Sequence, residues 1–139
     1  MTGPANPSGR IAFVGSGPGD PALLTVRARD VLTGSPLVIT DPDVPEGILA
    51  LAADGAEVRP AVGQPADIAS DLLTEAGQGR SVARLVSGDP LTNDAVVAEA
   101  MAVSASGTPF DVVPGVPSST AVPAYAGVAL GSAHVEADV

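Results

Sequence analysis

Three glycine-rich turns and one aspartate turn carry the residue types that could bind a ligand and move a proton. The glycine-rich turns read GSGPGD at 15–20, SGDP at 87–90 and VPGVPSS at 113–119. Glycine tolerates positive φ angles and lets a ligand touch bare backbone, so these turns favour ligand binding. The aspartate turn reads TDPD at 40–43, where Asp41 is either an ordinary turn residue or a general base.

The first glycine-rich turn does not match the dinucleotide-binding pattern, because that pattern requires glycine where this chain has Asp20. Asp20-Pro21 and Asp89-Pro90 instead combine a helix-capping carboxylate with a proline suited to the first helical position. A carboxylate at a helix amino terminus competes with the phosphates that such a terminus otherwise attracts. A ligand with positive charge is therefore favoured over NAD or ATP. S-adenosylmethionine, which carries sulfonium and ammonium groups, meets this condition.

Charge composition narrows the partners further. The formal net charge of −10 comes from 16 acidic and 6 basic side chains, so we expect neither nucleic acid nor a membrane surface as a partner. Arg59 alone is placed at the carboxyl end of a predicted strand, which makes it the candidate for binding a substrate carboxylate. The other arginines are expected at the surface or in ion pairs: Arg10, Arg27, Arg29, Arg80 and Arg84. His134 stands alone and the chain has no cysteine, so we expect no metal site.

The elements that must position these turns alternate short apolar runs with helical patterns, which is typical of βαβ units. Hydrophobic residues make up 45% of the sequence and aromatic residues only 2%, as suits a sheet and helices packed through Val, Leu, Ile and Ala. We predict strands at 11–14, 37–40, 57–59, 82–86 and 110–113, and helices at about 21–32, 46–53, 65–76 and 91–104. A last helical stretch follows the turn 113–119 and runs through Tyr125. The predicted fold is α/β, with a three-layer, five-stranded, mostly parallel sheet and helices on both faces.

Each of the three glycine-rich turns follows a predicted strand, and ligands of open α/β sheets bind outside the carboxyl ends of the strands. We therefore expect the turns to converge on one sheet edge. Residues 1–9 show no periodicity and are expected to form a disordered leader to a domain at 10–139. No apolar run reaches the roughly 20 residues of a membrane span, and the amino terminus lacks signal-peptide features, so a cytoplasmic protein is expected.

Five segments, taken in order, resemble the tetrapyrrole methylase family. They are VGSGPGDPALLTVRA at 14–28, LVITD at 37–41, RLVSGDP at 84–90, VVPGVPSS at 112–119 and PAYAGVAL at 123–130. The match covers the chain from about Arg10 onward, and its details are similar to the amino-terminal part of bacterial fusions with uroporphyrinogen-III synthase. The resemblance implies an S-adenosylmethionine-dependent C-methyltransferase of uroporphyrinogen III, in the sirohaem and cobalamin branch of tetrapyrrole biosynthesis.

The resemblance also implies roles for individual residues. Asp41 matches the family aspartate proposed to take a proton during C-methylation. The residues implied to bind S-adenosylmethionine are Pro18, Gly19, Gly88, Asp89, Leu91, Ser118 and Ser119. The cosubstrate would lie between this domain and a second domain of similar size. We expect that second domain to be absent from this chain, which alone would be inactive, and we expect a methylase domain, a fused synthase domain or a second copy as partner.

Two departures from the family pattern leave an alternative open. Gly63-Gln64-Pro65 stands where members active on uroporphyrinogen have Gly-Lys-Arg, and 91–95 replaces a glycine- and arginine-rich stretch. Both changes remove positive charge, although a substrate with many carboxylates normally meets several arginines or lysines. The alternative function is a degenerate, non-catalytic module that binds a ligand or a partner and is attached to a uroporphyrinogen-III synthase.

Overall fold

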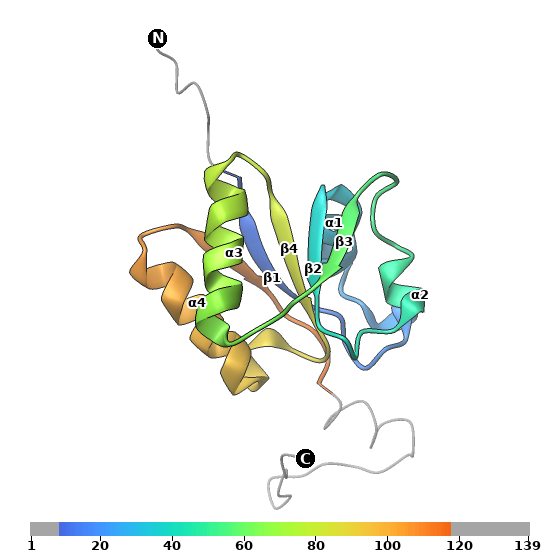
Figure 1. Ribbon diagram of the computed structural model, residues 1–139. Coiled ribbons are helices and arrows are strands. Elements are labelled where there is room, and N and C mark those ends of the chain that lie inside the picture. The colour runs from blue at the N-terminus through green and yellow to red at the C-terminus, as the bar shows by residue number, and fades with distance from the viewer. Residues whose placement is uncertain (1–8, 118–139) are drawn as a thin grey trace, which may run out of the picture.

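The computed structural model describes residues 9–117, and its described strands form one sheet in the order β3-β2-β4-β1-β5. All neighbouring strands are parallel, so the predicted sheet is confirmed and is parallel throughout its described part (Figure 1). The strands are β1 (Ile11–Gly15), β2 (Leu37–Thr40), β3 (Glu57–Pro60), β4 (Val82–Val86) and β5 (Phe110–Val113).

Helices cover both faces of this sheet, as predicted for a three-layer α/β fold. The α-helices are α1 (Val26–Gly34), α2 (Glu46–Leu49), α3 (Pro65–Gly77) and α4 (Asp94–Ala105), and two 3-10 turns are η1 (Pro21–Leu23) and η2 (Pro90–Thr92). Figure 1 shows α3 and α4 on one side of the sheet and α1 and α2 on the other. None of the described helices is long and apolar enough to cross a membrane.

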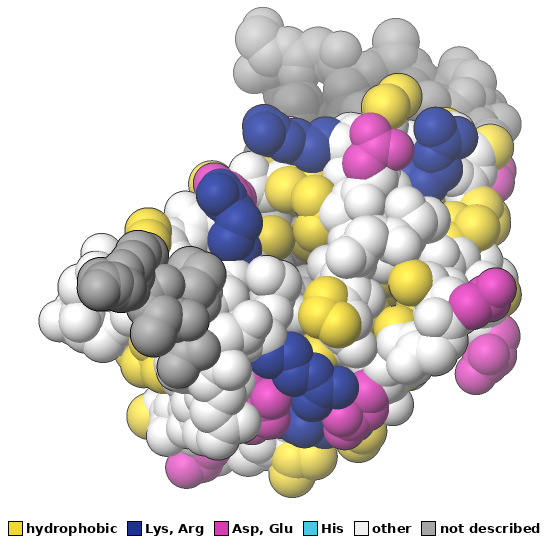
Figure 2. All heavy atoms as spheres, turned by 90° about the horizontal axis from the view of Figure 1, so that it is seen from above, with side chains coloured by type: hydrophobic (Ala, Val, Ile, Leu, Met, Phe, Trp, Pro, Cys, Tyr) yellow, Lys and Arg dark blue, Asp and Glu magenta, His cyan; other side chains and the backbone are white. Residues whose placement is uncertain are grey.

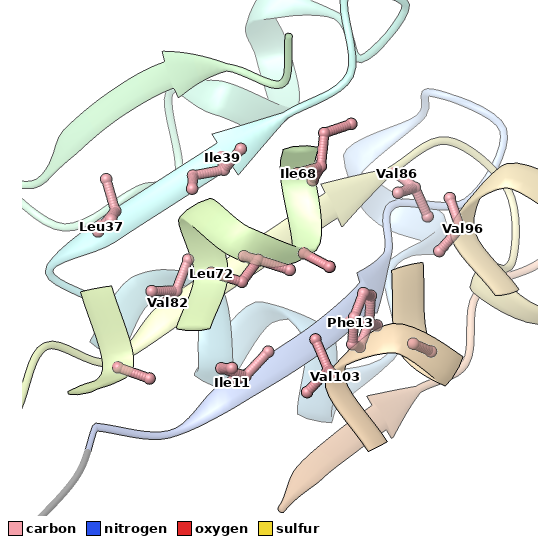
Figure 3. Packing of buried hydrophobic residues seen from close by; sticks show 13 residues of the cluster. Ile11, Phe13, Leu37, Ile39, Ile68, Leu72, Val82, Val86, Val96 and Val103 are labelled. Atoms are coloured by element: carbon pink, nitrogen blue, oxygen red, sulfur yellow. The ribbon is translucent and has the colours of Figure 1, made fainter. Parts of the chain in front are cut away.

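Strands β1, β2 and β4 are buried on both faces, which explains why they are apolar runs rather than alternating patterns. Successive side chains of β1 enter different cores, with Phe13 packed under α3 and α4 and Val14 packed under α1 and α2. Figure 3 shows the first of these cores, where Leu72 of α3 and Val103 of α4 lie over the strands. Phe13 also meets Phe110 edge to face, with ring centroids 5.5 Å apart.

Three predicted helices are shorter than expected, and two of them are interrupted by a capping residue. The predicted helix 21–32 is the 3-10 turn η1 followed by extended backbone, and Thr25 then caps α1 by accepting a hydrogen bond from the Ala28 amide. The predicted helix 91–104 likewise divides at Asn93, which caps α4. Helix α2 ends at Leu49 rather than at residue 53. The predicted leader, except Gly9, and the last predicted helix lie outside the described residues.

Candidate functional site

The glycine-rich turns after β1, β4 and β5 are in direct backbone contact at the carboxyl edge of the sheet. Gly17 and Gly88 exchange two backbone hydrogen bonds, of 3.2 and 2.8 Å between nitrogen and oxygen. A Cβ added to Gly15 would lie 2.5 Å from the carbonyl oxygen of Gly88, and one added to Gly115 would lie 2.2 Å from the same oxygen. No side chain fits there, so the predicted convergence of the three turns is confirmed and requires glycine.

Asp89 connects two of these turns. One carboxylate oxygen, Oδ2, accepts a hydrogen bond from the Leu91 amide at 3.0 Å and caps η2, as the sequence predicted. The other, Oδ1, accepts a hydrogen bond at 3.0 Å from the amide of Gly115, in the turn after β5. Asp20 caps η1 through the Ala22 amide, which confirms the other predicted cap. Carboxylates therefore occupy both short helical starts, where an anionic ligand would otherwise be attracted.

Other predicted cosubstrate residues lie around this junction. Pro18 and Gly19 are partly exposed in the turn after β1, and the backbone of Gly19 has a φ of 117°. The φ of Gly88 is 64°, so it also adopts a conformation that favours glycine. Leu91 is 61% exposed at this edge. Ser118 and Ser119 lie outside the described residues.

Asp41 follows β2 at the same edge of the sheet. Its backbone amide donates a hydrogen bond to the carbonyl oxygen of Leu85 in β4. Its carboxylate oxygen Oδ1 lies 2.7 Å from the Arg84 guanidinium, and the side chain is 21% exposed. The carboxylate of Asp41 is thus paired with a buried guanidinium and is itself partly exposed to solvent.

Arg84 is held by a second carboxylate inside the core between the sheet and α4. Its Nε and Nη2 atoms donate hydrogen bonds of 2.7 and 2.9 Å to the two oxygens of Glu99. Burial lowers the pKa of Arg84, but the hydrogen bond and charge of Glu99 and the charge of Asp41 outweigh burial and raise the pKa above its ordinary value. The guanidinium therefore stays charged, and Asp41, Arg84 and Glu99 form one connected cluster.

Arg84 was predicted at the surface or in an ion pair, and Glu99 was not among the predicted site residues. The ion pair is confirmed, but the side chain is buried. Two features of the sequence indicate this buried ion pair. Arg84 interrupts an apolar run that fills a central strand, and Glu99 shares the buried face of α4 with Val96 and Val103.

A second cross-strand contact lies beside Asp41. The hydroxyl of Ser87, after β4, donates a hydrogen bond of 2.7 Å to Asp43, after β2. Ser16, in the turn after β1, is fully buried, and its hydroxyl has no hydrogen-bond partner in the described part of the chain. These polar side chains lie in the turns that also hold the predicted site residues.

Arg59, the predicted substrate contact, already has carboxylate partners. Its guanidinium lies 2.6 Å from Asp71 and 3.0 Å from Glu75, both on α3, and 3.3 Å from Glu57. Burial lowers the pKa of Arg59, but the hydrogen bonds of Glu75 and Asp71 outweigh burial and raise it above its ordinary value. The charge of Arg59 is therefore balanced within this domain, and its contact with a substrate stays a prediction.

The opposite edge of the sheet, where the strands begin, carries charged side chains and a hollow. Arginine and acidic side chains lie against one another on this face, as Figure 2 shows, and they include the ion pair of Arg10 with Asp111. A hollow of about 410 Å³ lies there, where β1 and β5 begin, and its lining includes Gly107 and Phe110. Among residues 9–117, no group of three or more His, Cys, Asp or Glu side chains could hold a metal ion.

The chain is similar to several known proteins. It is 37% identical over 138 residues to siroheme synthase 1 of Cronobacter sakazakii, a match that covers 94% of this chain and 29% of that protein. It is also 37% identical over 127 residues to an S-adenosyl-L-methionine-dependent uroporphyrinogen III methyltransferase of Methanosarcina barkeri, covering 86% of this chain and 50% of that protein. The chain therefore spans half or less of the length of these relatives.

The chain is also similar to solved structures of methyltransferases. The crystal structure of uroporphyrin-III-C-methyltransferase from Thermus thermophilus matches with a TM-score of 0.81 and 38% identity, over 88% of this chain and 54% of that chain. A Thermus thermophilus uroporphyrin-III C-methyl transferase structure complexed with S-adenyl homocysteine matches with a TM-score of 0.73 and 39% identity, over 79% of this chain and 49% of that chain. The family model of tetrapyrrole (corrin/porphyrin) methylases matches residues 10–139, and the chain belongs to this family.

Proposed function

We propose that this chain forms the S-adenosylmethionine-facing wall of a methyltransferase that acts on uroporphyrinogen III. The observation that carries the proposal is the junction of the three glycine-rich turns at the carboxyl edge of the sheet, where the backbones of Gly15, Gly88 and Gly115 pack directly against one another. The capping carboxylates of Asp20 and Asp89 favour a cationic ligand over a phosphate at this edge. The similarity to a structure complexed with S-adenyl homocysteine supports the same ligand class.

Within this proposal the turns bind and orient the cosubstrate. Bound S-adenosylmethionine supplies the methyl group, and the residues proposed to hold it are Pro18, Gly19, Gly88, Asp89 and Leu91, with Ser118 and Ser119. The contribution of these residues to the rate is placement, because a backbone cradle fixes the direction of approach to the acceptor carbon. We propose no metal at this site.

Asp41 is proposed to take a proton that the substrate releases when a methyl group is added to one of its carbons. Its Oδ1 is ion-paired with Arg84, and its side chain is partly exposed at the same edge as the glycine-rich turns. A positioned carboxylate base of this kind contributes typically 10²- to 10⁴-fold to a rate. Arg59 would contact a substrate carboxylate only where the substrate replaces the carboxylates of α3 as its partners.

The other wall is proposed to come from a partner domain. Two exposed apolar side chains lie at the carboxyl edge of the sheet. Val26, at the start of α1, is 70% exposed, and Leu91, in η2, is 61% exposed. A partner domain that closes the site from this side would cover both side chains. The relatives with solved structures are about twice as long as the matched region, so we propose a second methylase domain as the partner.

The proposal is tested with Asp41→Asn in the complete gene product that contains these residues. Transfer of a labelled methyl group from S-adenosylmethionine to uroporphyrinogen III is measured, together with the affinity for S-adenosylhomocysteine. We expect the transfer rate to fall about 100-fold or more, since the variant keeps the shape but not the base, with little change in affinity. Asp54→Asn, an exposed aspartate before β3, is the control. Equal losses of rate and affinity would make Asp41 a structural residue, and no transfer by the wild type would refute the proposed activity.

A further inference from the structure

The cluster of Glu99, Arg84 and Asp41 connects the interior of the domain to the candidate site. Glu99 lies on α4, Arg84 in the middle of β4, and Asp41 directly after β2. Only 1–2% of the Glu99 and Arg84 side chains is exposed, whereas 21% of Asp41 is. The three charges thus run from a fully buried position to the exposed edge of the sheet.

One guanidinium nitrogen serves both carboxylates. Nη2 of Arg84 lies 2.9 Å from Oε2 of Glu99 and 2.7 Å from Oδ1 of Asp41. Nε of Arg84 donates a further hydrogen bond to Oε1 of Glu99, so Glu99 binds the guanidinium in the bidentate geometry that fixes its plane. The direction in which Nη2 meets Asp41 is therefore set by Glu99.

The backbone of Asp41 is fixed at the same point. The carbonyl oxygen of Leu85 accepts hydrogen bonds from the Asp41 amide, at 3.0 Å, and from Nη1 of Arg84, at 3.2 Å. Both the main chain and the side chain of Asp41 are thus tied to Arg84 and its neighbour on β4. Among residues 9–117 the carboxylate of Asp41 is ion-paired through Oδ1, which leaves Oδ2 as the oxygen that can take a proton.

Charge balance supports a role beyond stability. Glu99 neutralises Arg84 inside the core, so the negative charge of the cluster remains at Asp41 and faces the site. Burying an arginine and a glutamate is expensive, and replacing a buried ion pair by apolar residues is often neutral or stabilising. Fold stability alone therefore does not account for the pair, whereas fixing the orientation of a functional carboxylate does.

We propose that Arg84 and Glu99 are positioning residues for Asp41: Glu99 fixes the guanidinium of Arg84, which holds the Asp41 carboxylate in place at the mouth of the site. The role of Asp41 in proton transfer rests on the proposed function, but the coupling from Glu99 to Asp41 does not. The coupling can therefore be tested separately from methyl transfer.

The first test uses nuclear magnetic resonance on the full chain. In the wild type, the Nε–H of Arg84 should exchange with water about 100-fold more slowly than that of the exposed Arg27, because it is buried and hydrogen-bonded. Glu99→Gln keeps the shape of the side chain but removes its charge. We expect it to speed exchange at Arg84 about tenfold or more and to shift the carboxyl carbon resonance of Asp41, which Glu99 does not touch.

Asp94→Asn is the matched control, because Asp94 is an exposed carboxylate on the same helix. It should move neither signal. An unchanged Asp41 resonance in a folded Glu99→Gln protein would overturn the proposal, as would an Arg84 that exchanges as fast as Arg27. If circular dichroism shows that Glu99→Gln does not fold, Glu99→Asp, which keeps the charge but withdraws it from Arg84, decides the question by the same two signals.

The second test separates placement from binding. In the complete gene product, Glu99→Gln should lower kcat for methyl transfer about tenfold or more, since small misplacements of a reacting group are costly, while the Kd for S-adenosylhomocysteine stays within about twofold of the wild type. Equal weakening of kcat and Kd would mean that the pair supports the whole domain and not Asp41. A wild-type protein without methyl transfer would refute the proposed function, and the resonance shifts would still decide the coupling.

Discussion

Replacing Gly115 by alanine should separate two of the turns that form the candidate cosubstrate wall. The new Cβ would lie 2.2 Å from the Gly88 carbonyl oxygen and 2.9 Å from the Gly15 carbonyl carbon, and both neighbours are backbone atoms that cannot rotate away. Ordinary van der Waals contact begins near 3.4 Å, so the turns must move apart by about 1 Å. Overpacking of this kind costs roughly 1–3 kcal/mol of folding free energy.

The same displacement should weaken ligand binding. It moves the turn that also contains Asp89, whose Oδ1 accepts the hydrogen bond of the Gly115 amide. Loss of about 1.4 kcal/mol of binding free energy corresponds to a tenfold weaker affinity, and we expect at least that for S-adenosylhomocysteine. Calorimetry measures the affinity, and urea unfolding followed by circular dichroism measures the stability.

Gly77→Ala is the control, because an added Cβ at the end of α3 has no neighbour within 4 Å. It should unfold at the same urea concentration as the wild type or slightly higher, since alanine favours the helix. A Gly115→Ala protein with wild-type affinity and wild-type stability would refute the close contact of the three turns and the binding role derived from it.

Three further predictions concern the charged side chains. Glu99→Ala should lower the free energy of unfolding by about 3–5 kcal/mol, because it leaves Arg84 buried and short of a partner. The double variant Arg84→Met, Glu99→Leu should have a free energy of unfolding within about 1 kcal/mol of the wild type. Equal losses for the two variants in urea unfolding would contradict this. Arg59→Ala should lower the free energy of unfolding by about 1 kcal/mol or less, and less still at high salt; a higher KM for uroporphyrinogen III in the complete gene product would in addition support a substrate contact. The hydrogen bonds of Arg80 and Arg59 hold the pKa of Glu57 below its ordinary value of 4.5, so the stability that they provide is present above pH 4.5 and is lost as the pH falls through the lowered pKa. Glu57→Gln should flatten this acid dependence in urea titrations at several pH values, and an unchanged slope would argue against the ion pairs.

The strands and the layers could be predicted because their signals are local. Runs such as LVIT at 37–40 and FDVV at 110–113 are short, mostly apolar and bounded by turn residues, and the strands match these bounds. The helix starts were predicted less well. Thr25 and Asn93 lie within helical patterns, yet each side chain binds backbone amides ahead of it and starts the helix several residues late.

The candidate site could be predicted in its turns but not in its interior. Glycine and capping aspartate follow from local backbone chemistry, so the turns and the two caps were predicted from the sequence. The partners of Arg84 and Arg59 depend on which helix packs over which strand, and no local pattern specifies that. Glu99 is fifteen residues from Arg84 in the chain, and only the packing of α4 against the sheet brings the two together.

Binding of the methyl donor by the three glycine-rich turns is tested by titrating the isotope-labelled chain with S-adenosylhomocysteine. The backbone amide resonances of Gly17, Gly88 and Gly115 should shift together and saturate at one ligand concentration, while those of Gly107 and Phe110 at the opposite end of the sheet should stay unchanged. Shifts confined to the opposite end of the sheet, or no shifts at high ligand concentration, would show that these turns do not bind the methyl donor.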